Sequence, residues 1–170
     1  MARLAAKIIF AASLLAVAAC SKKPPAELPP APVTEQPDQG VDQGVGNEIV
    51  PGSQADFVSK VMSDRVLFAL DDHDLDAEDR QILDSQIAWL KQYPNVRATI
   101  EGHADERGTR EYNLALGERR ANAAKNYLAA NGIASTRIST ISYGKERPDA
   151  LGSDETSWAR NRRAVTVTVQ

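Results

Sequence analysis

Four side chains in one part of the sequence could together bind a ligand that carries both charges. Asn113, Leu116 and Arg120 are spaced three and four residues apart, so on a helix they share one face. Asp105 lies in the polar segment that leads into this helix, whose first backbone amides can also bind an anion. Arg120 can donate two parallel hydrogen bonds to a carboxylate, and Asp105 can accept from an ammonium group. This combination predicts a pocket for a zwitterion, unless Asp105 and Arg120 simply pair with each other.

The same acidic segment also permits a catalytic interpretation. Glu101, Asp105 and Glu106 could supply the paired carboxyl groups of a glycosidase. Such enzymes need a long sugar-binding cleft, for which the roughly 115 residues of the C-terminal part leave little room. The sequence contains no Ser-His-Asp or Cys-His arrangement and no glycine-rich phosphate loop. A hydrolase that uses the acidic segment is therefore the second interpretation.

A metal site is not expected. The acidic run that begins at Asp72 resembles a calcium-binding loop, but Ala77 and Leu83 occupy the positions that require glycine and glutamate. His73 and His103 are the only histidines and have no cysteine at a zinc-ligand spacing. We expect a polar surface role for both histidines, and no metal ion or other cofactor.

Helices and strands alternate in the part of the chain that must position these side chains. Alternating apolar residues predict strands, and apolar residues three or four apart predict helices. A short helical turn is expected near Trp158, and Gly132 ends the long helix. The order is β-α-β-α-β-β, an α/β (α+β) two-layer sandwich in one domain over 56–170. The expected strands are 65–70, 96–101, 138–143 and 165–169, and the helices are 76–93 and 111–131.

The first 19 residues are typical of a secretory signal peptide. Arg3 and Lys7 are followed by an apolar run that is too short to span a bilayer as a helix. The run ends in Val-Ala-Ala-Cys, which resembles a bacterial lipobox, and this resemblance implies lipidation of Cys20. In lipoproteins of this kind, an aspartate after the cysteine favours retention in the inner membrane. Ser21 stands at that position here, so we expect the outer membrane. Cleavage of an ordinary signal peptide near Ala19, which would leave a free thiol, is the alternative.

Residues 20–55 have the composition of a linker. Seven of the nine prolines lie between Lys22 and Gly52, while every aromatic residue lies outside that stretch. We expect a semi-extended, disordered tether that holds the domain away from a membrane. The net charge is −3 and the isoelectric point is near 5.4, which excludes a basic nucleic-acid-binding surface for the whole chain.

Five motifs give the C-terminal part a family resemblance. Over about 64–170 the chain resembles the OmpA-like peptidoglycan-binding domain family, and its Asp-Glu-Arg-Gly-Thr version is similar to that of the lipoproteins of the Tol–Pal system. Two positions differ from the pattern of the family. Arg110 lies where these domains often have proline, and Ala69 lies where many have a small or acidic residue. The motifs are EGHADERGT at 101–109, EYN at 111–113, LGERRA at 116–121, SYGKERP at 142–148 and NRRAV at 161–165.

The resemblance implies a non-catalytic protein, anchored to the outer membrane by its lipid, whose periplasmic domain binds the meso-diaminopimelate of the peptidoglycan stem peptide. The free end of that residue carries an ammonium and a carboxylate. The resemblance further implies binding of TolB and of the C-terminal domain of TolA, and a role in outer-membrane integrity and constriction at division. The resemblance places Asp71 in the same pocket, which Thr109 completes. Arg163 is the best further candidate for contact with the ligand. A peptidoglycan-modifying hydrolase is the alternative function.

Overall fold

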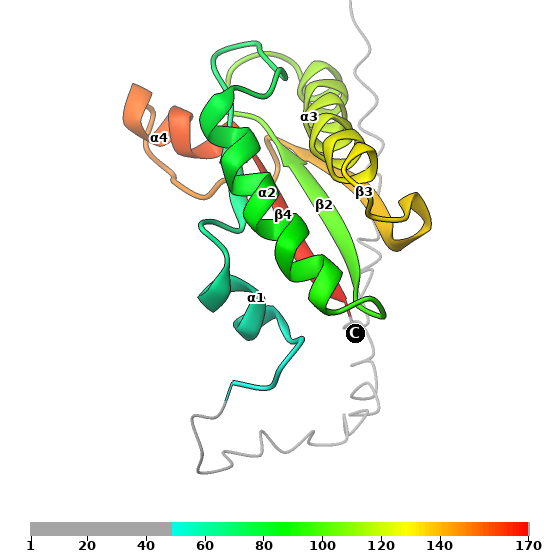
Figure 1. Ribbon diagram of the computed structural model, residues 1–170. Helices are drawn as coiled ribbons and strands as arrows, with labels where there is room; N and C mark the ends of the chain where they lie inside the picture. The colour runs from blue at the N-terminus through cyan, green and yellow to red at the C-terminus, as the bar shows by residue number, and fades with distance from the viewer. Residues whose placement is uncertain (1–48, 170) are drawn as a thin grey trace, which may run out of the picture. The chain divides into compact units, whose positions relative to one another are not determined.

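The computed structural model describes residues 49–169, which form a four-stranded sheet with helices packed against it (Figure 1). The expected signal peptide, Cys20 and most of the expected linker lie outside the described residues. The α/β class is confirmed. The strands are β1 (Arg65–Leu67), β2 (Arg97–His103), β3 (Ile138–Gly144) and β4 (Arg163–Val169), and the helices are α1 (Gln54–Lys60), α2 (Ala77–Gln92), α3 (Arg110–Ala130), the 3-10 turn η1 (Ser135–Arg137) and α4 (Glu155–Asn161).

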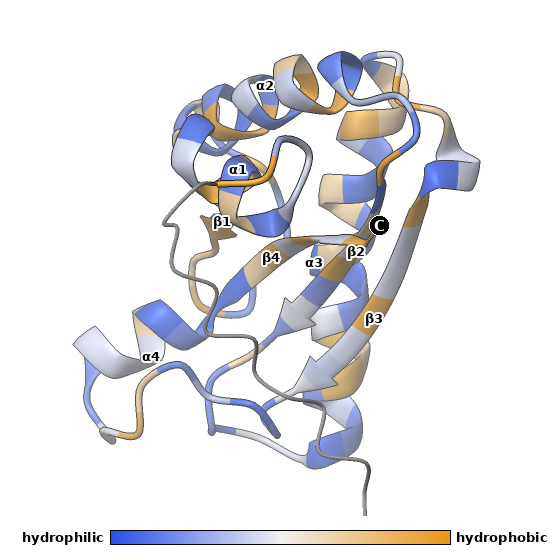
Figure 2. Cartoon of the chain, turned by 90° about the horizontal axis from the view of Figure 1, so that it is seen from below, coloured by the Kyte–Doolittle hydropathy of each residue, from blue (hydrophilic) through white to orange (hydrophobic). Residues whose placement is uncertain are grey.

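The strand order is β1-β4-β2-β3, so the last strand of the sequence lies inside the sheet. β4 pairs antiparallel with both β1 and β2, while β3 pairs parallel with β2. The parallel pair is joined by α3, which packs across β2 and β3. Both α2 and α3 mix apolar and polar residues along their length, as expected of helices that bury one face (Figure 2).

The acidic run that resembles a calcium loop serves to start α2. The Asp76 carboxylate accepts a hydrogen bond from the backbone N–H of Asp79, and the Asp79 carboxylate accepts one from the N–H of Asp76. This reciprocal capping box satisfies amides that the first turn of a helix leaves free. It fixes the beginning of α2 where the sequence predicts it.

Two glycines bring α3 into direct backbone contact with the end of β2. A Cβ atom on Gly102 would lie 1.8 Å from the carbonyl oxygen of Gly117, so no larger residue fits without moving the helix. The Ser142 hydroxyl of β3 adds a 2.7 Å hydrogen bond to the carbonyl of Leu114. These contacts hold the N-terminal half of α3 against the ends of β2 and β3.

Two details differ from the sequence prediction. β1 ends at Leu67 rather than at residue 70, because the chain turns away from the sheet and Asp71 adopts a positive φ of 60°. Leu70, expected on the buried face of the strand, is 61% exposed. The sequence pattern also gave no indication of α1, which is anchored through Asp56: its buried carboxylate accepts from the indole N–H of Trp89 and pairs with Lys60.

Candidate functional site

The predicted site residues come together around a hollow of about 310 Å³ between the β1–α2 loop, the β2–α3 loop and the N-terminal half of α3. Five of the six expected residues line it: Asp71, Asp105, Asn113, Leu116 and Arg120. The sixth, Thr109, is the N-cap of α3, and its hydroxyl accepts from the backbone N–H of Tyr112. Its role in the described structure is to begin the helix that carries three of the others.

Arg120 is fully buried, with 0% of its surface exposed. Its guanidinium donates to three backbone carbonyls, those of Asp72 at 2.8 Å, His103 at 2.8 Å and Ala69 at 3.1 Å. A guanidinium has five N–H donors, so one donor remains on each terminal nitrogen. Burial, together with the positive charge of Arg162, lowers the pKa of Arg120 to about 10, and the side chain stays charged at neutral pH.

Asp105 is also buried, with 5% of its surface exposed. It pairs with Arg107 and not with Arg120: Arg107 Nη2 lies 2.6 Å and Nε 3.2 Å from the carboxylate oxygens. The backbone N–H of Arg107 donates to the same carboxylate at 3.1 Å. Burial alone would raise the pKa of Asp105, but the hydrogen bonds from Arg107 outweigh it and hold that pKa below its ordinary value. Asp105 is therefore a carboxylate at neutral pH.

Arg107 is the main residue of the site that the sequence analysis missed. Its side chain is 35% exposed and its guanidinium stacks on the ring of Trp158, 4.1 Å from the ring centre. Glu155 lies 3.9 Å from it on the same helix, α4. The available signal was its position two residues after Asp105 in a turn, where an arginine can reach back to the carboxylate.

Arg162, rather than the expected Arg163, lines the hollow. Arg162 donates to the carbonyl of Phe68 at 2.9 Å, pairs with Glu155 at 2.8 Å, and places Nη1 3.5 Å from Asp105. Arg163 instead donates to the carbonyls of Asn161 and Arg147. Arg162 is the C-cap of α4 and Arg163 is the first residue of β4, and of the two only Arg162 lines the hollow.

The remaining wall of the hollow combines apolar and polar groups. Leu116 forms a buried apolar surface, and the Asn113 amide donates to the carbonyl of Arg107 at 2.7 Å, which ties the β2–α3 loop to α3. At the rim, the Tyr112 hydroxyl donates to the carboxylate of Asp71. Tyr112 and the exposed Leu70 also line the hollow, and neither is among the residues that the sequence predicts for the site.

The three carboxylates of the glycosidase interpretation are each held by different partners, and that of Asp105 is bound by Arg107. His103, expected at the surface, is instead buried, and Glu101 lies 3.6 Å from its ring. Glu106 accepts from the indole N–H of Trp158 at 2.9 Å. Burial, reinforced by the positive charges of three nearby arginines, lowers the pKa of His103 to about 4, so this ring is neutral at pH 7. Of the three carboxylates, only that of Asp105 lines the hollow.

Comparison with known proteins identifies the family. The model of the OmpA family matches residues 67–162. A peptidoglycan-associated lipoprotein of Brucella melitensis is 48% identical over 90% of this chain and 85% of its own length. One from Agrobacterium fabrum is 46% identical over 90% of this chain and 81% of its own. The chain belongs to the OmpA family and, within it, to the peptidoglycan-associated lipoproteins.

Solved structures agree with this assignment. The peptidoglycan-associated lipoprotein of Burkholderia pseudomallei superposes with a TM-score of 0.62 at 40% identity, over 66% of this chain and 93% of that one. The C-terminal domain of Helicobacter pylori MotB, at 17% identity and a TM-score of 0.59, shares the fold. Within residues 49–169, no helix has the length and hydropathy needed to cross a membrane.

Proposed function

We propose that the domain is a non-catalytic anchor that binds diaminopimelate-type peptidoglycan in the hollow between α3 and the β2–α3 loop. The observation that carries the proposal is that two buried groups of opposite charge line this hollow. A buried carboxylate, that of Asp105, and a buried guanidinium, that of Arg120, line one hollow without forming an ion pair with each other. A free zwitterionic end of a ligand can satisfy both groups.

The assignment of each charge follows from the donors and acceptors that remain. Arg120 has one N–H left on each terminal nitrogen, which can donate to the carboxylate of diaminopimelate. Asp105 can accept from the ammonium, which then takes the place of the Arg107 side chain. Asn113 and Leu116 contact the ligand from α3, Asp71 contacts it from the rim, and Thr109 keeps the N-terminus of α3 in place.

The resemblance to relatives that are named lipoproteins supports the rest of the proposal. We assign lipidation to Cys20 and attachment to the outer membrane to the lipidated chain, with residues 20–55 as tether and 56–170 as the peptidoglycan-binding domain. In this arrangement the protein links the outer membrane to the cell wall as part of the Tol–Pal system. Its partners there would be TolB and the C-terminal domain of TolA, and its role would be to support membrane integrity and constriction at division.

The electrostatics of the acidic loop argue against a hydrolase. A glycosidase needs a carboxylic acid whose pKa is raised, so that it can protonate the leaving group. Burial raises the pKa of Asp105, but the hydrogen bonds from Arg107 lower it more. The pKa of Glu106 is lowered by hydrogen bonds from Ser153 and Trp158. Both groups are therefore charged at neutral pH, which suits a binding site better than a proton donor.

Incubation with insoluble cell wall tests the choice between anchor and hydrolase. A purified fragment of residues 49–170, which contains the domain, should sediment with diaminopimelate-type peptidoglycan and release no soluble muropeptides. Release of muropeptides that rises with time would contradict the proposal, as would a domain that stays in the supernatant.

Fractionation of cells that express the Cys20→Ala variant tests the anchor separately. No other cysteine can carry the acyl groups. The variant should therefore accumulate as an unprocessed precursor in the inner-membrane or soluble fraction. Normal recovery in the outer membrane would show that the lipid assignment is wrong.

A further inference from the structure

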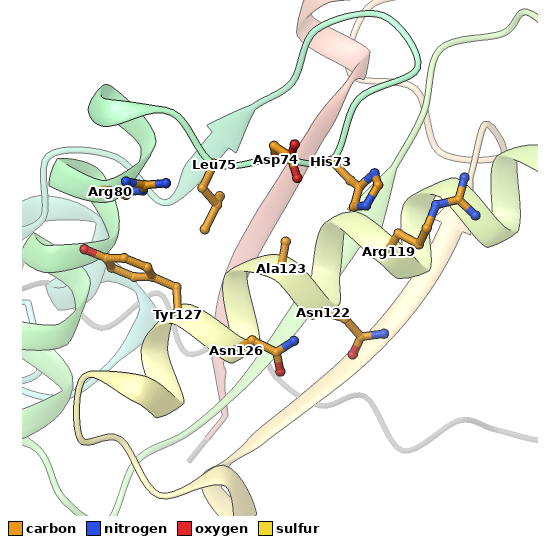
Figure 3. Close-up of a pocket in the computed structure, with 9 residues that line it drawn as sticks. All are labelled: His73, Asp74, Leu75, Arg80, Arg119, Asn122, Ala123, Asn126 and Tyr127. Carbon is orange, nitrogen blue, oxygen red and sulfur yellow. The ribbon is translucent and has the colours of Figure 1, made fainter.

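A second and larger hollow lies beside the first, on the other side of the β1–α2 loop. It is a groove of about 670 Å³ between residues 73–75, α2 and the middle of α3. In Figure 3 the side chains of Leu75 and Ala123 face each other across it, and Arg80 and Arg119 lie toward its opposite ends. The groove therefore has an apolar middle and a cationic group at each end.

The groove offers more hydrogen-bond donors than acceptors. Neither Arg80 nor Arg119 has a carboxylate within 4.0 Å among residues 49–169, in contrast to Arg107 and Arg162 of the first hollow. Asn122 and His73 add further donors. Asp74 is the only acidic residue in the lining, and it is exposed to solvent. A groove of this composition suits a ligand that presents carboxylate or carbonyl oxygens.

One end of the groove is close to the proposed diaminopimelate pocket. Arg119 is next to Arg120 in the sequence, and its guanidinium lies 6.0 Å from the ring centre of Tyr112, which lines that pocket. His73 is two residues from Asp71, a distance of roughly 7 Å at most. A peptide bound in the first hollow therefore needs to extend by only one or two residues to reach the end of the groove at His73 and Arg119.

We propose that His73 and Arg119 form a subsite for a second carboxylate of the same stem peptide. This inference rests on the proposed function. Two carboxylates lie within one residue of diaminopimelate along the peptide: the free α-carboxylate of the γ-linked glutamate on one side, and the terminal carboxylate of alanine on the other. Arg119 supplies the positive charge and His73 an N–H donor, while the far end of the groove at Arg80 takes no part.

Titration calorimetry with three tetrapeptides tests the subsite. The first is alanyl-γ-glutamyl-diaminopimelyl-alanine, the second carries an amide in place of the glutamate α-carboxylate, and the third carries an amide at the terminal alanine. An exposed ion pair contributes about two- to fivefold in affinity. One of the two amidated peptides should bind the domain weaker by that factor, and which one it is identifies the source of the carboxylate. Equal affinity for all three would overturn the subsite, although the proposed function would stand.

Two arginine variants test which residue of the protein causes the difference in affinity between the peptides. Arg119→Gln should bind the parent peptide two- to fivefold more weakly and should no longer distinguish it from the amidated peptide. Arg80→Gln is the matched control, because it removes another exposed arginine from the far end of the same groove, and it should retain the full discrimination. Discrimination that survives in Arg119→Gln would overturn the assignment. If none of the peptides binds the unmodified domain, the proposed function itself fails.

Discussion

The two sides of the first hollow are built in different ways. On the side of α3 and β2, Asn113, Leu116 and Arg120 are buried, and Arg120 is fixed by three backbone carbonyls. On the side of the β2–α3 loop and α4, Arg107 is partly exposed and contacts only other side chains at its guanidinium, those of Asp105, Glu155 and Trp158. One side is rigid, and the other can exchange its contacts with a ligand.

Because of this difference, the carboxylate and the ammonium of the ligand should be recognised in different ways. A donor that is already held in place loses little conformational entropy when it binds, so the rigid side can recognise the ligand carboxylate with high selectivity. The acceptor on the other side is available only after Arg107 moves, so part of the energy from the ammonium contact offsets the loss of an existing ion pair. We therefore expect substitutions on the two sides to affect stability and affinity in different proportions.

The largest effect on binding should come from Asp105→Asn, which removes the charge that faces the ammonium. Truncation of one partner in a buried charge pair costs about 2–5 kcal/mol, or roughly 30- to 5,000-fold in affinity. Co-sedimentation with cell wall would measure it. Glu111→Gln, an exposed carboxylate in the first turn of α3, is the control and should sediment as the unmodified domain does. Equal sedimentation of both variants would rule out the ammonium contact.

The largest effect on stability should come from Arg120→Met. The substitution leaves three carbonyls without their donor, and each buried unsatisfied group costs about 1–3 kcal/mol, so we expect a loss of at least about 3 kcal/mol. Urea denaturation measures this. The exposed Arg110, whose ion pair with Glu146 lies at the surface, serves as control: Arg110→Met should change the free energy of unfolding by less than about 1 kcal/mol. A stable Arg120→Met variant would show that the rigid side is not held by these bonds.

The ion pairs of Asp105 should appear in the pH dependence of stability. The pKa of its carboxyl group is lower in the folded state than the ordinary value of 3.8. Its contribution is therefore complete above pH 3.8 and is lost as the pH falls through the folded-state pKa. The difference in unfolding free energy between the unmodified domain and Asp105→Asn should be constant from pH 7 to about 5 and should shrink toward pH 3. A constant difference over the whole range would contradict the lowered pKa.

The smallest effect should come from Arg107→Gln on the exchangeable side. Without the arginine, the ligand ammonium no longer displaces an ion pair from Asp105, so affinity for the stem peptide should rise by up to about fivefold. Calorimetry with a diaminopimelate peptide would measure the change. A fall in affinity would mean that Arg107 itself binds the ligand, and that the two sides differ less than the contacts of the unbound domain suggest.

The sequence predicts the rigid side better than the exchangeable one. The spacing of Asn113, Leu116 and Arg120 follows from helix geometry, which depends on local sequence alone, and all three line the hollow. The three carbonyl partners of Arg120 belong to β2 and the β1–α2 loop, far away in the sequence, and no periodicity indicates them. Periodicity does not indicate the positions of Arg107 and Arg162 either, because these depend on loop turns and on the path of α4.

The ends of helices and strands can likewise be predicted where they depend on local sequence, and not where they depend on distant contacts. The start of α2 could be predicted because its capping box is local, with Asp76 and Asp79 three residues apart. The end of β1 could not, because the alternation of apolar residues continues through Leu70 while the chain has already left the sheet at Leu67. The missed helix α1 depends on contacts with Trp89, more than thirty residues away.

Titration of the domain with two stem peptides tests the central claim most directly, namely that Arg120 recognises the carboxylate at the free end of diaminopimelate. Peptides with lysine at this position keep the ammonium and lack only that carboxylate. A lost hydrogen bond to a charged group costs about 1.5–3 kcal/mol, so the diaminopimelate peptide should bind roughly ten- to a hundredfold more tightly. This comparison leaves the buried Arg120 intact and avoids the loss of stability that its replacement would cause. Equal affinity for the two peptides would show that Arg120 only supports the fold.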